Sequence, residues 1–158
     1  MRRRRKAREI ALQHLYAMEI SGNPIEVEIE QIRASENLDE EICEFALSLL
    51  RKVHSNQERL DQDVSVMVQN WDYERIALLD RLILRQALGE LIYFEEIPPK
   101  VTINEAIDMA KKFSTAESGR FVNGVLDGLY KKLKEEKRIM KAGRGLIDTK
   151  NIDSHGKP

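Results

Sequence analysis

Apolar side chains recur every three or four residues along almost the whole chain, and no stretch alternates strictly between apolar and polar positions. This spacing gathers apolar side chains on one face of an α-helix, and such a face is buried against a neighbour. Only eight glycines and four prolines interrupt the pattern. The sequence therefore predicts an all-α protein of six or seven helices in two packed helical bundles, residues 1–70 and 71–137.

The ends of the predicted helices carry their own signals. Gly22 follows the first periodic stretch, over about residues 3–20, and glycine often ends a helix. A polar patch at residues 54–57 predicts a bend in the long third helix. Beyond about residue 138 the periodicity fades, which predicts a flexible, basic C-terminal tail over residues 138–158. Capping boxes, in which a glutamate follows a capping residue by three positions, predict helix starts at Asn37, Thr102 and Ser114.

Composition excludes several classes of protein. No run of 18 apolar residues is present, so no transmembrane helix is expected, and the N-terminus lacks the apolar stretch of a secretory signal. A single cysteine, Cys43, cannot form an internal disulfide, and three histidines argue against a structural zinc site. These features predict a soluble protein of a reducing compartment, without a metal or cofactor.

Catalytic motifs are missing from the sequence as well. It contains no glycine-rich phosphate loop, no HExxH or GxSxG motif and no paired cysteines at metal-ligand spacing. His14 lies in the apolar stripe of the first predicted helix, between Ile10 and Met18, where a partly buried, hydrogen-bonded histidine is expected rather than a catalytic one. The sequence thus predicts a protein that is not an enzyme.

The charge distribution is more informative than the net charge of -1. Residues 1–8 carry six bases and no acid, and residues 131–158 carry nine bases and four acids. Residues 9–130 hold the remaining 11 bases and 23 acids. An acidic body with two basic ends favours contact between an end and an anionic partner such as nucleic acid.

The arginine-rich start is the sharpest candidate binding site. Arginine binds phosphate with a fork of donors and stacks on unpaired bases. Phosphate contacts beside an aromatic ring suit single-stranded RNA better than duplex DNA. The alternative is a solvated, solubilising start. One flank of the first predicted helix, at steps of three, four and four residues, carries Arg5, Arg8, Leu12 and Tyr16.

A second candidate site is the corner between the last two predicted helices, residues 111–121. The first turn of a helix presents unpaired N–H groups to an anion. The alternative is an ordinary corner with Phe113 and Phe121 in the core. Residues that add charge, a hydroxyl group and a stacking ring there are Lys112, Ser118, Arg120 and Phe121.

Several stretches resemble the NusB family of bacterial transcription antitermination factors. The resemblance covers about residues 3–135, in the family's order, and its last two stretches are specific when found together. The tail from about residue 138 is not part of the family pattern. The stretches are residues 4–9 (RRKARE), 11–16 (ALQHLY), 80–87 (DRLILRQA), 97–106 (IPPKVTINEA) and 121–127 (FVNGVLD).

The resemblance implies an all-helical cytoplasmic protein without enzymatic activity. Family members bind the boxA element of nascent ribosomal RNA leader transcripts, as a heterodimer with the ribosomal protein NusE, and help the RNA polymerase antitermination complex to pass terminators. The implied NusE-facing residues are Asp80, Leu84 and Arg85. The implied RNA-binding residues are Arg4, Arg5, Lys6, Arg8 and Tyr16 at the start, and Glu117, Ser118, Arg120 and Phe121 at the corner.

Three alternatives stay open at this point. A related RNA-binding module occurs attached to ribosomal RNA methyltransferases, but it needs a downstream glycine-rich cofactor-binding domain, for which this chain is too short. A DNA-binding helical regulator is the second alternative, with the helix pair around Ser114 as its reading head. The third is a protein-interaction adaptor, as a monomer or a homodimer, in which the arginine run is merely solvated.

Overall fold

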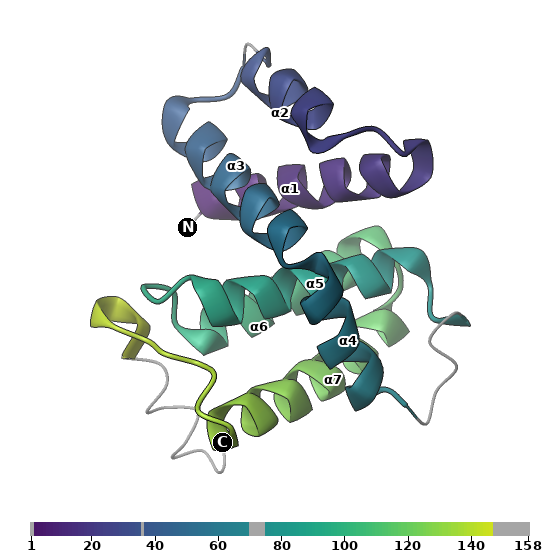
Figure 1. The fold of residues 1–158 in the computed structure, drawn as a ribbon, viewed down its shortest axis with the longest axis vertical. Helices are drawn as coiled ribbons and strands as arrows, with labels where there is room; N and C mark the ends of the chain where they lie inside the picture. Colours follow the sequence, from purple (N-terminus) through teal and green to yellow (C-terminus); the bar gives the residue numbers. More distant parts are fainter. Residues whose placement is uncertain (1, 36, 70–74, 147–158) are drawn as a thin grey trace. The chain divides into compact units, whose positions relative to one another are not determined.

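The structure is a computed structural model that describes residues 2–35, 37–69 and 75–146. Within these ranges it is all-helical, as predicted, and has no strand. Packing contacts divide the chain into two compact units, residues 1–57 and 58–158. The first unit holds α1 (Arg2–Ser21), α2 (Ile25–Arg33) and α3 (Glu40–Ser55) (Figure 1). The second holds α4 (Gln57–Met67), α5 (Leu78–Tyr93), α6 (Pro99–Phe113), α7 (Ala116–Glu135) and the 3₁₀ turn η2 (Gly143–Leu146).

In the first unit, α3 packs against both α1 and α2. Helix α1 ends at Ser21 because Gly22 adopts the left-handed conformation, with φ +73°, and donates its N–H to the carbonyl of Met18 at 2.8 Å. The predicted glycine stop is confirmed. The buried side chains of α1 repeat at helical spacing: Ala7, Arg8, Ala11, Leu12 and Leu15.

Three predicted capping residues do not cap their helices. Helix α3 is capped by Asp39, whose carboxylate accepts a backbone N–H bond at 2.9 Å, and not by Asn37. Helix α6 begins at Pro99, three residues before its predicted cap, since proline lacks the N–H that a first-turn residue leaves unpaired. Helix α7 is capped by Thr115 instead of Ser114. Several polar residues near a helix start can act as caps, so spacing to a glutamate alone does not select among them.

The predicted bend in the third helix is an interruption of the helix. Helix α3 ends at Ser55 and α4 begins at Gln57. Between them, Asn56 donates its side-chain amide to the carbonyl of Lys52 at 2.8 Å. That hydrogen bond satisfies one of the carbonyls that the end of a helix leaves unpaired.

Helix α5 is the most buried element of the second unit, as its apolar sequence predicts. Every residue from Leu82 to Leu91 is buried. Helices α6 and α7 pack against α5 and against each other, and Figure 1 shows the three helices side by side. A helix that is buried around most of its circumference needs hydrogen-bond partners for its polar side chains, and Arg85 and Glu90 find theirs in Asp61 and Thr102.

Two arginines, each paired with both oxygens of a carboxylate, attach α4 to the rest of the second unit. Arg85 of α5 donates Nε and Nη2 to the two carboxylate oxygens of Asp61, at 2.7 and 2.9 Å. Arg138, beyond α7, reaches both oxygens of Asp63, at 3.1 and 2.7 Å. Bidentate pairs of this kind are geometrically specific. The boundary between the two units lies between residues 57 and 58, at the first turn of α4. The predicted domain boundary, near Trp71, falls outside the described residues and stays a prediction.

Residues 138–146 depart from the predicted flexible tail. Lys141 donates Nζ to the carbonyl of Phe94 at 2.8 Å. Gly145 is buried so closely against the turn between α5 and α6 that a Cβ there would lie 2.1 Å from the carbonyl oxygen of Glu95. The segment is thus packed on the second unit. The rest of the predicted tail, beyond residue 146, lies outside the described residues.

The end of α7 is a Schellman motif with lysine where glycine is usual. Arg138 N–H donates to the carbonyl of Leu133 at 2.9 Å, and Lys137 has φ +57°. That left-handed conformation costs a residue with a Cβ about 1 kcal/mol. We expect Lys137→Gly to raise the free energy of unfolding by about 1 kcal/mol in urea denaturation. Lys137→Ala keeps the Cβ and should give no comparable gain; an equal gain would mean that the lost charge, not the backbone, is responsible.

Lys141 makes the stability of the second unit depend on pH. Burial lowers the pKa of Lys141 to about 8, against the opposing charges of Glu90, Glu96 and Glu95. The unfolded chain keeps this proton up to the ordinary value of 10.5, so the unfolded state binds more protons between those two pH values. The contribution of Lys141 to the free energy of unfolding therefore rises with pH across this window and is lost as the pH falls through about 8.

The test of this pH dependence compares the wild type with Lys141→Met by urea denaturation at several pH values. As the pH rises from about 8 to 10.5, we expect the free energy of unfolding of the wild type to increase relative to that of the variant. All other titrating groups are common to the two proteins and cancel. A difference that stays constant over this range would show that Lys141 keeps its ordinary pKa in the folded protein.

Candidate nucleic-acid interface

The arginine-rich start forms the first turns of α1 and lies against the start of α3. Arg3 Nη1 donates to Glu41 Oε1 at 2.6 Å, and Arg3 Nε lies 3.6 Å from Asp39 Oδ2. The hydrogen bond to Glu41 and the charge of Asp39 raise the pKa of Arg3 above its usual value. All three side chains are exposed, so these pairs add little stability, but they direct the start of α1 towards α3.

Two more arginines of this start lie over one aromatic ring. The guanidinium carbon of Arg4 is 4.5 Å, and that of Arg8 5.5 Å, from the centre of the Phe45 ring on α3. Both distances are within the range of a cation–π interaction. Arg8 is only 2 % exposed, and its contact with RNA stays a prediction. Arg5 and Lys6 are exposed.

The predicted strip of Arg5, Arg8, Leu12 and Tyr16 is not a continuous surface. Arg8 and Leu12 are buried, whereas Tyr16 is 41 % exposed. The four residues share a flank of α1, but that flank runs along the edge of its buried face. Helical spacing places side chains on one flank without saying how far a neighbouring element covers it.

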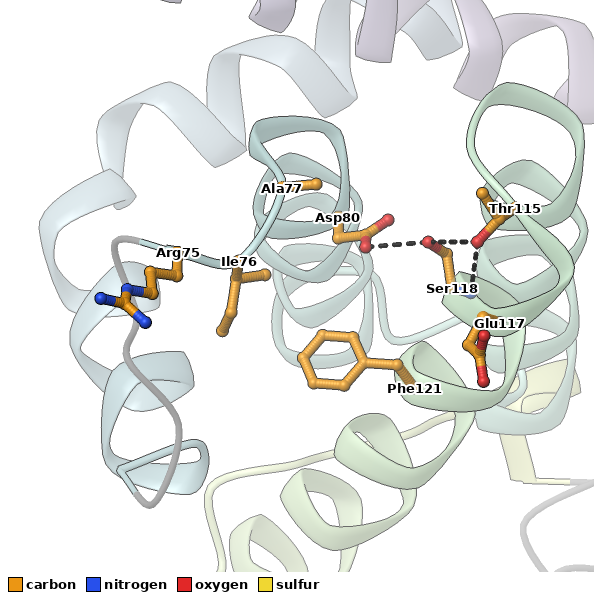
Figure 2. Close-up of a pocket in the computed structure, with 8 residues that line it drawn as sticks. All are labelled: Arg75, Ile76, Ala77, Asp80, Thr115, Glu117, Ser118 and Phe121. Atoms are coloured by element: carbon orange, nitrogen blue, oxygen red, sulfur yellow. Dashed lines mark hydrogen bonds between the residues drawn. The ribbon is translucent and has the colours of Figure 1, made fainter.

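The corner before α7 is held together by short polar side chains. Thr115 Oγ1 accepts the N–H of Ser118 at 3.0 Å, and Ser118 Oγ donates to Asp80 Oδ2 at 2.9 Å (Figure 2). Ser118 is only 8 % exposed and its side chain positions the corner, while its contact with RNA stays a prediction. The exposed side chains of Glu117 and Arg120 lie 3.8 Å apart, a separation at which an exposed pair adds little stability.

A pocket of about 650 Å³ opens beside this corner. Figure 2 shows the Phe121 ring extending from α7 towards Ile76, below the hydrogen bond between Asp80 and Ser118. The pocket joins an apolar ring to polar edges, which is the composition of many ligand sites. Its lining comes from the start of α5 and the segment before it (Arg75, Ile76, Ala77 and Asp80) and from the start of α7 (Thr115, Glu117, Ser118 and Phe121).

A second hollow, of about 480 Å³, shares Phe121 and Glu117 with the first. Its other lining residues are Met67, Val68, Arg120, Gly124 and Val125. Phe121 is half-buried and lines both hollows. No sequence motif marks Ile76 or Met67 as a site residue, because only the packing of α4 and α5 beside α7 brings them to this ring.

The predicted protein-interface residues are buried. Asp80, Leu84 and Arg85 are 7 %, 0 % and 5 % exposed. Asp80 accepts the hydroxyl group of Ser118 and Arg85 holds Asp61, so both polar side chains are engaged within the second unit. In the isolated chain these three residues therefore expose little area, and their contact with a protein partner stays a prediction.

Two further features concern the described residues as a whole. None of the helices in the described ranges is long and apolar enough to cross a membrane. The same ranges contain no group of three or more His, Cys, Asp or Glu side chains placed to hold a metal ion.

Comparisons with known proteins agree on one family. A family model described as the NusB family matches residues 5–131. The chain is 40 % identical over 153 residues, 96 % of each chain, to the transcription antitermination protein NusB of Salinibacter ruber. It is 36 % identical over 146 residues, 92 % of this chain and 69 % of the relative, to that of Chloroherpeton thalassium.

Solved structures agree with these relatives. The fold is similar to that of T. maritima NusB, with a TM-score of 0.75 and 35 % identity over 81 % of this chain and 90 % of the other. It is also similar to a structure of the antitermination factors NusB and NusE in complex with double-stranded RNA. There the TM-score is 0.74 and the identity 28 %, over 84 % of this chain and 98 % of the other.

Proposed function

The chain belongs to the NusB family, and on that basis we propose that it is a transcription antitermination factor, which binds RNA and a protein partner and is not an enzyme. The proposed ligand is the boxA element of nascent ribosomal RNA transcripts. The proposed partner is the ribosomal protein NusE, within the complex that lets RNA polymerase pass terminators. The observation that carries the proposal is 40 % identity spread over 96 % of both chains with a protein of this function.

We assign the phosphate contacts to the start of α1. Arg5 and Lys6 are exposed, and Arg4 is half-exposed beside the Phe45 ring. Arginine and lysine neutralise phosphates and thereby release counterions, which is the main source of affinity for nucleic acid. Tyr16, on the same helix, is exposed enough for its ring to stack on an unpaired base.

We assign a base contact to the corner before α7. The Phe121 ring, which lines both hollows, provides a stacking face, and the exposed Arg120 side chain provides a phosphate contact. Glu117, at the rim of both hollows, accepts hydrogen bonds from base amino groups.

The acidic body between the two basic ends suits a basic protein partner. Residues 9–130 hold 11 bases and 23 acids, and ribosomal proteins are basic as a class because they bind RNA. Complementary charge speeds the encounter of two proteins and selects against wrong partners. We place the function in the cytoplasm, where bacterial transcripts are made.

The experiment that tests this function is RNA binding measured by gel shift, with and without NusE. We expect a boxA single strand to bind more tightly than a scrambled strand, and NusE to strengthen the binding. Duplex DNA that competes equally with boxA RNA would instead support a DNA-binding regulator. Absence of any RNA shift, with a complex formed between the two proteins, would support an adaptor.

A further inference from the structure

We propose that Phe45 of α3 is a positioning residue for the RNA-binding start of α1, where its ring holds the guanidinium groups of Arg4 and Arg8. The inference rests on the proposed RNA-binding function. It assigns to a residue that does not itself contact RNA the task of keeping the adjacent Arg5 and Lys6 on an ordered helical turn.

The start of α1 has little local reason to be helical. Its first turn contains no acidic residue. Cations at a helix N-terminus are unfavourable because the helix dipole is positive there. Like charges three or four positions apart also repel one another, as do Arg4 and Arg8. An arginine-rich helix start of this kind frays unless a tertiary contact stabilises it.

That tertiary contact comes from one face of α3. Glu41 and Phe45 lie four residues apart on α3, so they share a face. Glu41 binds Arg3, while the Phe45 ring lies under Arg4 and Arg8, at 4.5 and 5.5 Å. A ring face attracts cations through its negative quadrupole, and the attraction strengthens where water is excluded, as at Arg8.

The Phe45 ring is itself fixed by packing. It lies against a cluster formed by the buried Ala7, Ile42 and Ala46, with Ile10 and Leu38 at the edge. Ala7 is placed between Arg4 and Arg8 along α1, and its small side chain lets the ring approach both guanidinium groups. The basic run therefore has two parts: Arg4 and Arg8 attach the helix to α3, and Arg5 and Lys6 have exposed side chains.

The first test needs no RNA. Trypsin cleaves after arginine and lysine in unfolded segments, so cleavage within residues 1–8, followed by mass spectrometry, reports fraying of the first turns. We expect cleavage there to be about tenfold faster in Phe45→Leu than in the wild type, because two cation–π contacts are lost. Phe45→Tyr keeps the ring and should stay within twofold of the wild type. Cleavage of Phe45→Leu at the wild-type rate would overturn the inference.

The second test is RNA affinity and its salt dependence. We expect Phe45→Leu to bind RNA about tenfold more weakly with an unchanged salt slope, since the charges remain and only their ordering is lost. Ile10→Ala is the matched control, because it removes packing from the same cluster but leaves the ring. If Phe45→Leu and Ile10→Ala weakened RNA binding equally, Phe45 would act only through its packing in the core, and the inference would be wrong.

The two tests separate the inference from the proposed function. If the wild type binds no RNA but Phe45→Leu is cleaved faster, the ordering role holds and the RNA-binding function is wrong. If the wild type binds RNA and Phe45→Leu matches it in both affinity and cleavage, the function holds and the ordering role is wrong.

Discussion

Replacing Arg5 and Lys6 together with alanine is expected to weaken RNA binding about a hundredfold at low salt, with helix content unchanged. Both side chains are exposed on α1, and a hydrogen bond to a charged group contributes about 1.5 kcal/mol or more, which is roughly tenfold in affinity for each residue. The slope of log affinity against log salt should also fall by about 1.4, since each phosphate contact to a single strand contributes about 0.7. Fluorescence anisotropy at several salt concentrations measures both quantities.

A control with the same change in charge comes from the other end of the first unit. Arg51 and Lys52 are exposed near the end of α3, and their replacement with alanine removes the same two charges. We expect this control to change RNA affinity by less than about threefold, because long-range attraction between exposed charges is screened by salt. Equal losses in the two double variants would mean that RNA senses only the total charge. No loss in either would remove the start of α1 from the interface.

The second large effect is expected on stability, at a buried carboxylate between α1 and α2. Glu28 is 1 % exposed; its Oε1 lies 2.6 Å from His14 Nδ1, and Asn23 donates to its Oε2 at 3.3 Å. The prediction that His14 is partly buried and hydrogen-bonded is confirmed. The sequence did not identify Glu28 as the partner of His14, because Glu26, Glu28 and Glu30 alternate along α2 and look alike in the sequence.

We expect His14→Leu to lower the free energy of unfolding by about 3 kcal/mol, because the variant leaves a buried carboxylate without its closest partner. Chemical denaturation followed by circular dichroism gives the value. The double variant His14→Leu with Glu28→Leu should lie within about 1 kcal/mol of the wild type, since replacing both members of a buried pair by apolar residues is often nearly neutral. A double variant as unstable as the single one would show that lost packing, and not the isolated charge, is the cause.

Local sequence predicted those features of the fold that depend on a single helix. Periodicity predicted helices throughout, and Gly22 ended the first helix where expected, because dihedral preferences act within a few residues. The polar patch around Asn56 marked the right place, but it ends a helix where only a bend was predicted. Capping residues were harder to predict. Thr102 is a suitable cap by sequence, yet its hydroxyl donates to Glu90 at 2.5 Å, inside the second unit. A hydroxyl group at a helix start donates its hydrogen bond to the better acceptor, and here that acceptor is Glu90 on the neighbouring helix α5.

The candidate site, too, has features that depend on local sequence and features that depend on tertiary packing. The sequence by itself determined that the chain is helical, that six bases begin it, and that the corner before α7 carries an aromatic ring beside a base. Only the tertiary structure decided which of these side chains are exposed. Phe45, far from the arginines in sequence, covers Arg8, and the packing of α5 buries Leu84. Spacing along a helix identifies the side chains that share a face, whereas exposure depends on elements distant in sequence.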